Sequence, residues 1–139
     1  MFLVLAAASG FTGPAIDGSV RELARWLGLA LGAGGGLLAL RGLYDLRRQV
    51  TPLPYPPDGA RLVEEGAYRL VRHPIYGGIV LGGLGWALVT AAPAAFVMAS
   101  VLFIFFDLKA RREEVWLEER LPGYAAYRRR TRRLVPWLY

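Results

Sequence analysis

Two short stretches of the sequence gather residues that could do chemistry. The first, residues 66–78, contains Arg72, the lone histidine His73, Pro74 and Tyr76. Pro74 is well placed to open a helix, because the first amide of a helix has no intrahelical partner. His73 would then lie at the N-cap, and a helix start attracts carboxylates and phosphates. The stretch predicts either an anion-binding helix start walled by tyrosines or a capped surface loop.

The second stretch, residues 109–117, holds Lys109 and the carboxylate pair Glu113 and Glu114. Lys109 and Glu113 share a helix face, because residues four apart are neighbours on a helix. Ionisable groups at the end of a membrane helix often serve only as interfacial anchors. The carboxylate pair would face either solvent or an internal cavity. Asp107, one turn earlier, is interpreted as an isolated structural acid.

Composition excludes several kinds of site. The chain has no cysteine and one histidine, which rules out disulfides, thiolate metal sites and any metal site that needs two histidines. Neither stretch pairs a nucleophile with a base. Together they supply positive charge, a helix start, tyrosines and carboxylates, a set that suits a zwitterionic, nucleotide-like cofactor beside an apolar substrate.

Hydropathy places these stretches next to a membrane. Hydrophobic residues make up 55% of the 139-residue chain, and residues 75–106 carry no charge. One straight helix of that length would be about 48 Å long, whereas the hydrocarbon core is about 30 Å thick. A hairpin therefore fits better, with helices at residues 75–90 and 94–109 and a turn at residues 91–93.

Earlier segments add further membrane helices. Residues 20–44 predict a spanning helix, and residues 1–16 a short or partial one. Residues 51–58 contain four prolines and predict an extended linker. Residues 60–72 are amphipathic and belong at the membrane surface. The sequence predicts one all-α integral membrane bundle of three to four membrane helices. Its parts are N-terminal helices (1–50), linker and cofactor loop (51–74), hairpin (75–108), and C-terminal helix with basic tail (109–139).

Charge predicts the orientation. The net charge is +6, and residues 109–139 carry nine basic and four acidic residues, a balance of 9 − 4 = +5. Basic residues favour the cytoplasmic side and anionic lipid. We therefore expect the cofactor site and the tail on the cytoplasmic face, with membrane lipids as partners. Nucleic acid is not expected, because no nucleic-acid-binding motif accompanies the charge.

Glycines predict close helix packing. Gly28, Gly32 and Gly36 recur every four residues, as do Gly78 and Gly82. This spacing lets membrane helices approach closely. The glycine-lined helices are also compatible with a homodimer.

Four ordered blocks carry a family resemblance. They are Gly66-x-Tyr68-x-x-Val71-Arg72-His73-Pro74-x-Tyr76-x-Gly78, Glu113-Glu114-x-x-Leu117, Tyr124-x-x-Tyr127 and Arg133-x-x-Pro136. In this order they resemble the isoprenylcysteine carboxyl methyltransferase family, whose wider group includes the membrane phospholipid N-methyltransferases. The resemblance covers residues 61–136. It implies a multi-span helical membrane enzyme that uses S-adenosylmethionine.

The resemblance also implies roles for individual residues. Arg72 is added to this set for its charge beside the helix start. The residues expected at the cofactor are Arg61, Leu62, Val63, Tyr68, Arg72, His73, Pro74, Ile75, Tyr76 and Glu113. Lys109 occupies the position of a substrate-binding arginine, which keeps the charge and loses the bidentate fork. The expected catalytic residues are Lys109, Glu113 and Glu114.

The predicted function is S-adenosylmethionine-dependent methyl transfer to a lipid-like or prenylated acceptor. A carboxylate acceptor would need Lys109 or a nearby arginine to hold it. An amine acceptor would need a base, for which Glu113 and Glu114 are candidates. Two alternatives stay open: an NADPH-dependent membrane reductase of the sterol-reductase type, and a non-catalytic adaptor whose arginine tail binds anionic lipid.

Overall fold

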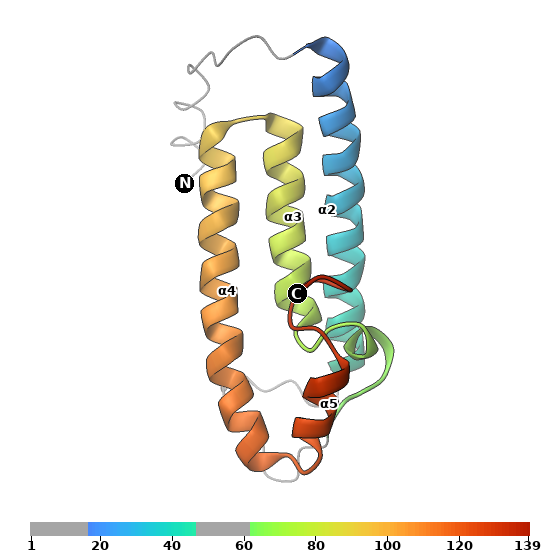
Figure 1. Ribbon diagram of the computed structural model, residues 1–139. Coiled ribbons are helices and arrows are strands. Elements are labelled where there is room, and N and C mark those ends of the chain that lie inside the picture. Colours follow the sequence, from blue (N-terminus) through green and yellow to red (C-terminus); the bar gives the residue numbers. More distant parts are fainter. Residues whose placement is uncertain (1–16, 47–61) are drawn as a thin grey trace.

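The computed structural model describes residues 17–46 and 62–139, and within these ranges the fold is helical with no strand. Figure 1 shows three long helices side by side, with the shorter elements gathered at one end. The elements are α2 (Gly18–Leu46), the 3₁₀ helix η2 (Gly66–Arg69), α3 (Pro74–Thr90), α4 (Pro93–Arg120) and α5 (Tyr124–Arg130). The all-α prediction is confirmed. The predicted segments 1–16 and 51–58 lie outside the described residues.

The predicted hairpin is present as α3 and α4. Ala91 adopts a left-handed conformation (φ 51°), and its amide bonds to the Ala87 carbonyl, which ends α3. Pro93 then opens α4 at a position where no amide is needed. Helix α4 continues past residue 109 to Arg120, so it carries both membrane-apolar residues and the carboxylate pair.

Helices α2 and α3 run antiparallel and meet along a glycine seam. A Cβ atom added to Gly28 would lie 2.5 Å from the Gly85 carbonyl oxygen. One added to Gly35 would lie 2.6 Å from the Gly78 carbonyl oxygen. Both distances are shorter than any side chain tolerates, so the seam requires glycine at these positions.

The four-residue spacing predicted for this packing is wrong at Gly32, Gly36 and Gly82. A Cβ atom at any of these three positions would meet nothing within 4 Å. The seam instead repeats every seven residues, at Gly28, Gly35 and Gly42 of α2 and at Gly78 and Gly85 of α3, because residues seven apart lie close to the same face of a helix.

The long helices suit a membrane. Helices α2 and α4 are long and apolar enough to cross a bilayer, and α3 is a shorter apolar helix. Many of their large apolar side chains are exposed, including those of Trp26, Leu37 and Ile104. Contiguous apolar surface of this kind requires a covering, and lipid supplies one. These helices therefore indicate an integral membrane protein.

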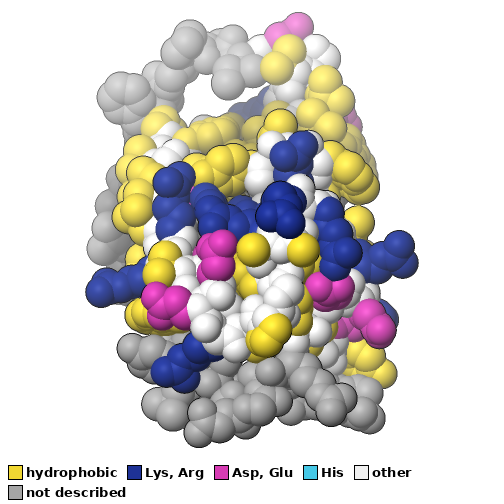
Figure 2. Space-filling model, turned by 60° about the horizontal axis from the view of Figure 1, so that its bottom comes forward, with side chains coloured by type: hydrophobic (Ala, Val, Ile, Leu, Met, Phe, Trp, Pro, Cys, Tyr) yellow, Lys and Arg dark blue, Asp and Glu magenta, His cyan; other side chains and the backbone are white. Residues whose placement is uncertain are grey.

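The shorter elements form a cap on one end of the bundle. Val71 pairs with Arg132 in an isolated parallel bridge, and the His73 amide donates to the Arg133 carbonyl at 3.0 Å. The tail thereby crosses the start of α3. A Cβ atom at Gly77 would lie 1.9 Å from the Leu134 carbonyl oxygen, so the crossing needs glycine there. Figure 2 shows Lys and Arg side chains gathered over this end, with hydrophobic side chains beyond them.

Candidate functional site

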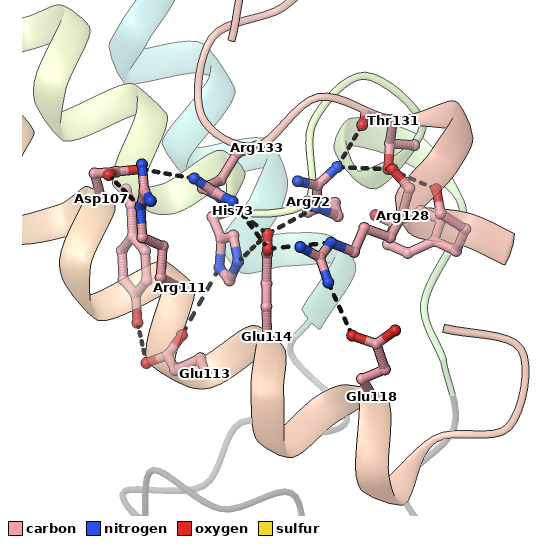
Figure 3. A network of polar contacts seen from close by, with 12 residues as sticks. Arg72, His73, Asp107, Arg111, Glu113, Glu114, Glu118, Arg128, Thr131 and Arg133 are labelled. Carbon is pink, nitrogen blue, oxygen red and sulfur yellow. Dashed lines mark hydrogen bonds and ion pairs between the residues drawn. The ribbon is translucent and has the colours of Figure 1, made fainter. Parts of the chain in front are cut away.

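The start of α3 brings His73 to the carboxylate pair of α4. His73 is the N-cap residue and Pro74 the first helical residue, as the sequence predicts. The imidazole is buried between the two acids (Figure 3). Its Nδ1 lies 3.7 Å from Glu113 Oε2, and its Nε2 lies 3.4 Å from Glu114 Oε1. The expected meeting of His73 with these acids is therefore present, across about forty residues of sequence.

Glu113 lies in an aromatic and cationic setting, called here the Glu113 cluster: His73, Tyr76, Phe106, Lys109 and Glu113. The Tyr76 hydroxyl donates to Glu113 Oε1 at 2.8 Å. The Tyr76 ring stacks on His73 and on Phe106, with centroids 5.4 and 4.9 Å apart. Lys109 Nζ lies 3.8 Å from Glu113 Oε1 and 5.0 Å from the Tyr76 ring centroid. The Glu113 side chain keeps 19% of its surface exposed, so it is open to a further partner.

Glu114 lies in a different setting. Its side chain is 2% exposed, and Arg72 Nε donates to its Oε1 at 2.8 Å. Arg133 donates to both carboxylate oxygens at 3.3 Å, and Arg128 Nε lies 3.8 Å from Oε2. Arg72 also donates to the carbonyl of Thr131. Arginines contact both carboxylate oxygens. Through these contacts Glu114 connects α4 to the start of α3, to α5 and to the tail.

Tyr68 lies under the same cap. Its carbonyl accepts a buried hydrogen bond from the Tyr127 hydroxyl at 2.6 Å. Burial raises the pKa of the Tyr68 phenol well above its usual range, and the carboxylates of Asp45 and Glu113 add to the rise. Asp45 itself accepts the Ala67 amide at 2.8 Å. Tyr68 therefore stays protonated near neutral pH and can act as a hydrogen-bond donor.

Two expected cofactor residues turn toward α2. Pro74 is fully buried, and a Cβ atom at Gly42 would lie 2.6 Å from Pro74 Cγ. The same atom would lie 3.3 Å from Ile75 Cγ1. These two side chains therefore pack into the groove that Gly42 leaves on α2, which fixes the position of the helix start.

The stretch 61–63 is also expected at the cofactor. Leu62 packs against the apolar cluster that contains Tyr124 and Tyr127. Val63 follows it and is half-buried, while Arg61 lies outside the described residues. Leu62 thus joins the core under α5.

Asp107 is the residue whose surroundings the sequence analysis missed. The prediction that it is isolated is wrong, because it accepts hydrogen bonds from Arg111 Nε at 2.7 Å and Arg133 Nη1 at 2.9 Å. The Tyr139 hydroxyl donates to it at 3.1 Å. The four-residue spacing to Arg111 could have revealed one partner. The other two come from the tail and follow only from the tertiary fold.

The arrangement offers a carboxylate, a lysine and stacked aromatic rings in one partly open cluster. It can accept hydrogen bonds or a proton at Glu113, and it can attract a cation through the carboxylate and the ring faces. Among residues 17–46 and 62–139, no group of three His, Asp or Glu side chains could hold a metal ion.

Comparison with known proteins gives two findings. Over 78 residues the chain is 35% identical to the cobalt-zinc-cadmium resistance protein CzcN of Cupriavidus metallidurans, a match that covers 55% of this chain. The matched region spans 36% of that relative's length. A family model described as phospholipid methyltransferase matches residues 23–122, from α2 to the end of α4. Together with the helical bundle and the ordered motif blocks, this match shows that the chain belongs to the phospholipid methyltransferase family.

Proposed function

We propose that the protein is an integral membrane methyltransferase that uses S-adenosylmethionine and methylates a lipid-like or prenylated acceptor. The observation that carries the proposal is the convergence of His73 and Tyr76, from the start of α3, on Glu113 of α4. Family membership supports methyl transfer as the reaction class.

The residues of the Glu113 cluster fit this cofactor. S-adenosylmethionine carries an aromatic base, a diol, a sulfonium cation and a zwitterionic amino acid. The cluster offers stacked rings at Tyr76 and Phe106, a carboxylate at Glu113 and a cation at Lys109. His73 Nε2 is buried 3.4 Å from Glu114 Oε1, so the imidazole is held beside the cluster by an ion-pair contact. The chain therefore presents aromatic rings, a carboxylate and a cation that complement the base, the sulfonium and the amino-acid part of the cofactor.

The cofactor, when bound, supplies an electrophilic methyl group: the S–CH₃ bonding pair stays on sulfur, and the acceptor's lone pair forms the new bond. The protein has to position the two partners, which can supply much of the rate. An amine acceptor must also lose a proton. We assign that proton to Glu113, since Glu114 is enclosed by arginines. A carboxylate acceptor would be held by Lys109, whose side chain is 44% exposed.

The location of the cluster suits a lipid-like acceptor. Phe106 and Lys109 lie where α4 passes from its apolar part into its charged part, and neighbouring Leu108 is exposed. An acceptor with an apolar tail could remain in the bilayer while its polar group reaches Glu113. The arginines gathered over this end favour the cytoplasmic face by the positive-inside rule (Figure 2).

The test is methyl transfer by reconstituted protein. Purified protein in liposomes is incubated with a bacterial lipid extract and S-adenosylmethionine labelled in its methyl group, and the labelled lipid is identified by mass spectrometry. We expect a labelled lipid product. If its acceptor is an amine, Glu113→Gln should reduce its formation by about 10²-fold or more, the usual range for loss of a general base. Glu118→Gln, which alters an exposed ion pair with Arg128, is the matched control. The absence of a labelled lipid, or an unimpaired Glu113→Gln variant, would refute the proposal.

A further inference from the structure

Residues 134–139, called here the 134–139 turn, form a compact turn in which four backbone amides bond within the turn. The main-chain oxygen of Tyr139 accepts the amides of Leu134 at 2.8 Å and Val135 at 2.9 Å. The Val135 carbonyl accepts the amides of Leu138 at 3.3 Å and Tyr139 at 3.1 Å. Pro136 has no amide to satisfy. Pairing of these amides lowers the cost of moving the turn out of water.

The turn lies alongside the membrane helices. The Tyr139 ring packs against Phe103 of α4, with centroids 5.8 Å apart, and its hydroxyl reaches Asp107. The neighbouring side chains of Ile104 and Phe105 are exposed and apolar. These two side chains belong to the exposed apolar surface of α4. The turn is therefore at the depth where that surface begins.

The outer side of the turn is apolar. Trp137 is 83% exposed and Leu138 is 80% exposed. Trp137 also has a left-handed backbone (φ 61°), a conformation that a residue with a side chain seldom adopts. On the inner side, the Tyr139 hydroxyl is bonded to Arg111 and Asp107. The polar groups are thus paired inward, while the two large apolar side chains point away from the protein.

We propose that the 134–139 turn inserts into the surrounding bilayer at the boundary between headgroups and acyl chains. Trp137 and Leu138 would then be buried in lipid, continuous with the exposed apolar face of α4. Tryptophan favours this boundary, because its ring is apolar and its indole N–H is polar. The preceding segment carries the exposed arginines Arg129 and Arg132, whose charge complements anionic headgroups.

The chain has no cysteine, so a single spin label can be placed without removing native thiols. Leu138→Cys is labelled with a nitroxide in liposomes made of equal parts phosphatidylcholine and phosphatidylglycerol. Electron paramagnetic resonance then compares collisions with oxygen, which concentrates in lipid, and with a water-soluble nickel chelate. Ile104→Cys is the lipid-exposed control, and Glu119→Cys is the water-exposed control.

We expect the oxygen-to-nickel accessibility ratio at position 138 to resemble that at position 104. A ratio equal to that at position 119 would overturn the proposal. Low accessibility to both reagents with spin–spin broadening would overturn it too, since it would show a second copy of the chain on the turn. Trp137→Cys repeats the measurement at the adjacent position and protects against a local disturbance by one label. The readout is independent of methyl transfer, so it fails or succeeds separately from the proposed function.

Discussion

Replacing Glu114 by glutamine tests whether this residue holds the cap on the bundle. The change keeps the shape of the side chain and removes its charge. It leaves Arg72, whose side chain is 7% exposed, and Arg133, whose side chain is 15% exposed, facing a neutral amide. Arg128 is 44% exposed and adds little to the effect.

The expected cost follows from this burial. Removing one partner of a buried ion pair typically costs about 3–5 kcal/mol, because the remaining charge is left uncompensated. For a chain of this size, 1 kcal/mol corresponds to roughly 3–4 °C in melting temperature. Glu114→Gln should therefore lower the melting temperature by about 10 °C or more.

The assay is thermal unfolding of detergent-solubilised protein, followed by circular dichroism. Glu118→Gln is the matched control on the same helix, since its partner Arg128 is exposed and such pairs contribute about 0–1 kcal/mol. A double-mutant cycle with Arg72→Gln adds a second measurement. The double variant should lose less stability than the two single losses combined, because both remove one shared interaction.

A melting temperature for Glu114→Gln within about 2 °C of the parent would correspond to less than 1 kcal/mol. That result would refute the inference that buried arginine pairing at Glu114 holds the cap, and it would return Glu114 to the candidates for the catalytic base.

Two further comparisons and one pH profile use the same unfolding assay. Gly35→Ala should lower the free energy of unfolding by about 1–3 kcal/mol, because its Cβ would overpack against the Gly78 carbonyl. Gly36→Ala should cause no loss, because its Cβ meets open space. Equal effects of the two substitutions would refute the seven-residue seam. Tyr127→Phe should lower the free energy of unfolding by about 1–3 kcal/mol, because it removes a buried hydrogen bond. Tyr124→Phe should be neutral or stabilising, because the Tyr124 hydroxyl is buried and forms no hydrogen bond within the described residues. Burial raises the pKa of both phenols, so they ionise at lower pH in the unfolded chain than in the folded one. The free energy of unfolding should therefore decline as the pH rises above about 10. A stability that stays constant through this alkaline range would contradict the assignment.

The sequence predicted those features that depend on local pattern. An uncharged run too long for one span, with Pro93 near its middle, predicted the α3–α4 hairpin. The His73-Pro74 pair predicted the start of α3. The meeting of His73 with the carboxylate pair followed from motif resemblance, because no periodicity links segments forty residues apart.

What the sequence could not predict depends on which face of a helix meets which neighbour. Gly28 begins both a four-residue and a seven-residue series, and only the packing against α3 selects the second. Glu113 and Glu114 are adjacent, so their side chains point about 100° apart on α4. One therefore reaches Tyr76 while the other reaches Arg72. The contacts of Asp107 with the tail likewise depend on the tertiary fold.

The most direct measurement is the affinity of the purified protein for S-adenosylmethionine, by isothermal titration calorimetry in detergent. If the Glu113 cluster holds the cofactor, the parent protein binds it. Glu113→Gln and His73→Ala each weaken binding at least tenfold, about 1.4 kcal/mol, while Glu118→Gln binds as the parent does. A parent protein that does not bind, or equal affinity in the parent and both variants, would contradict the proposed site.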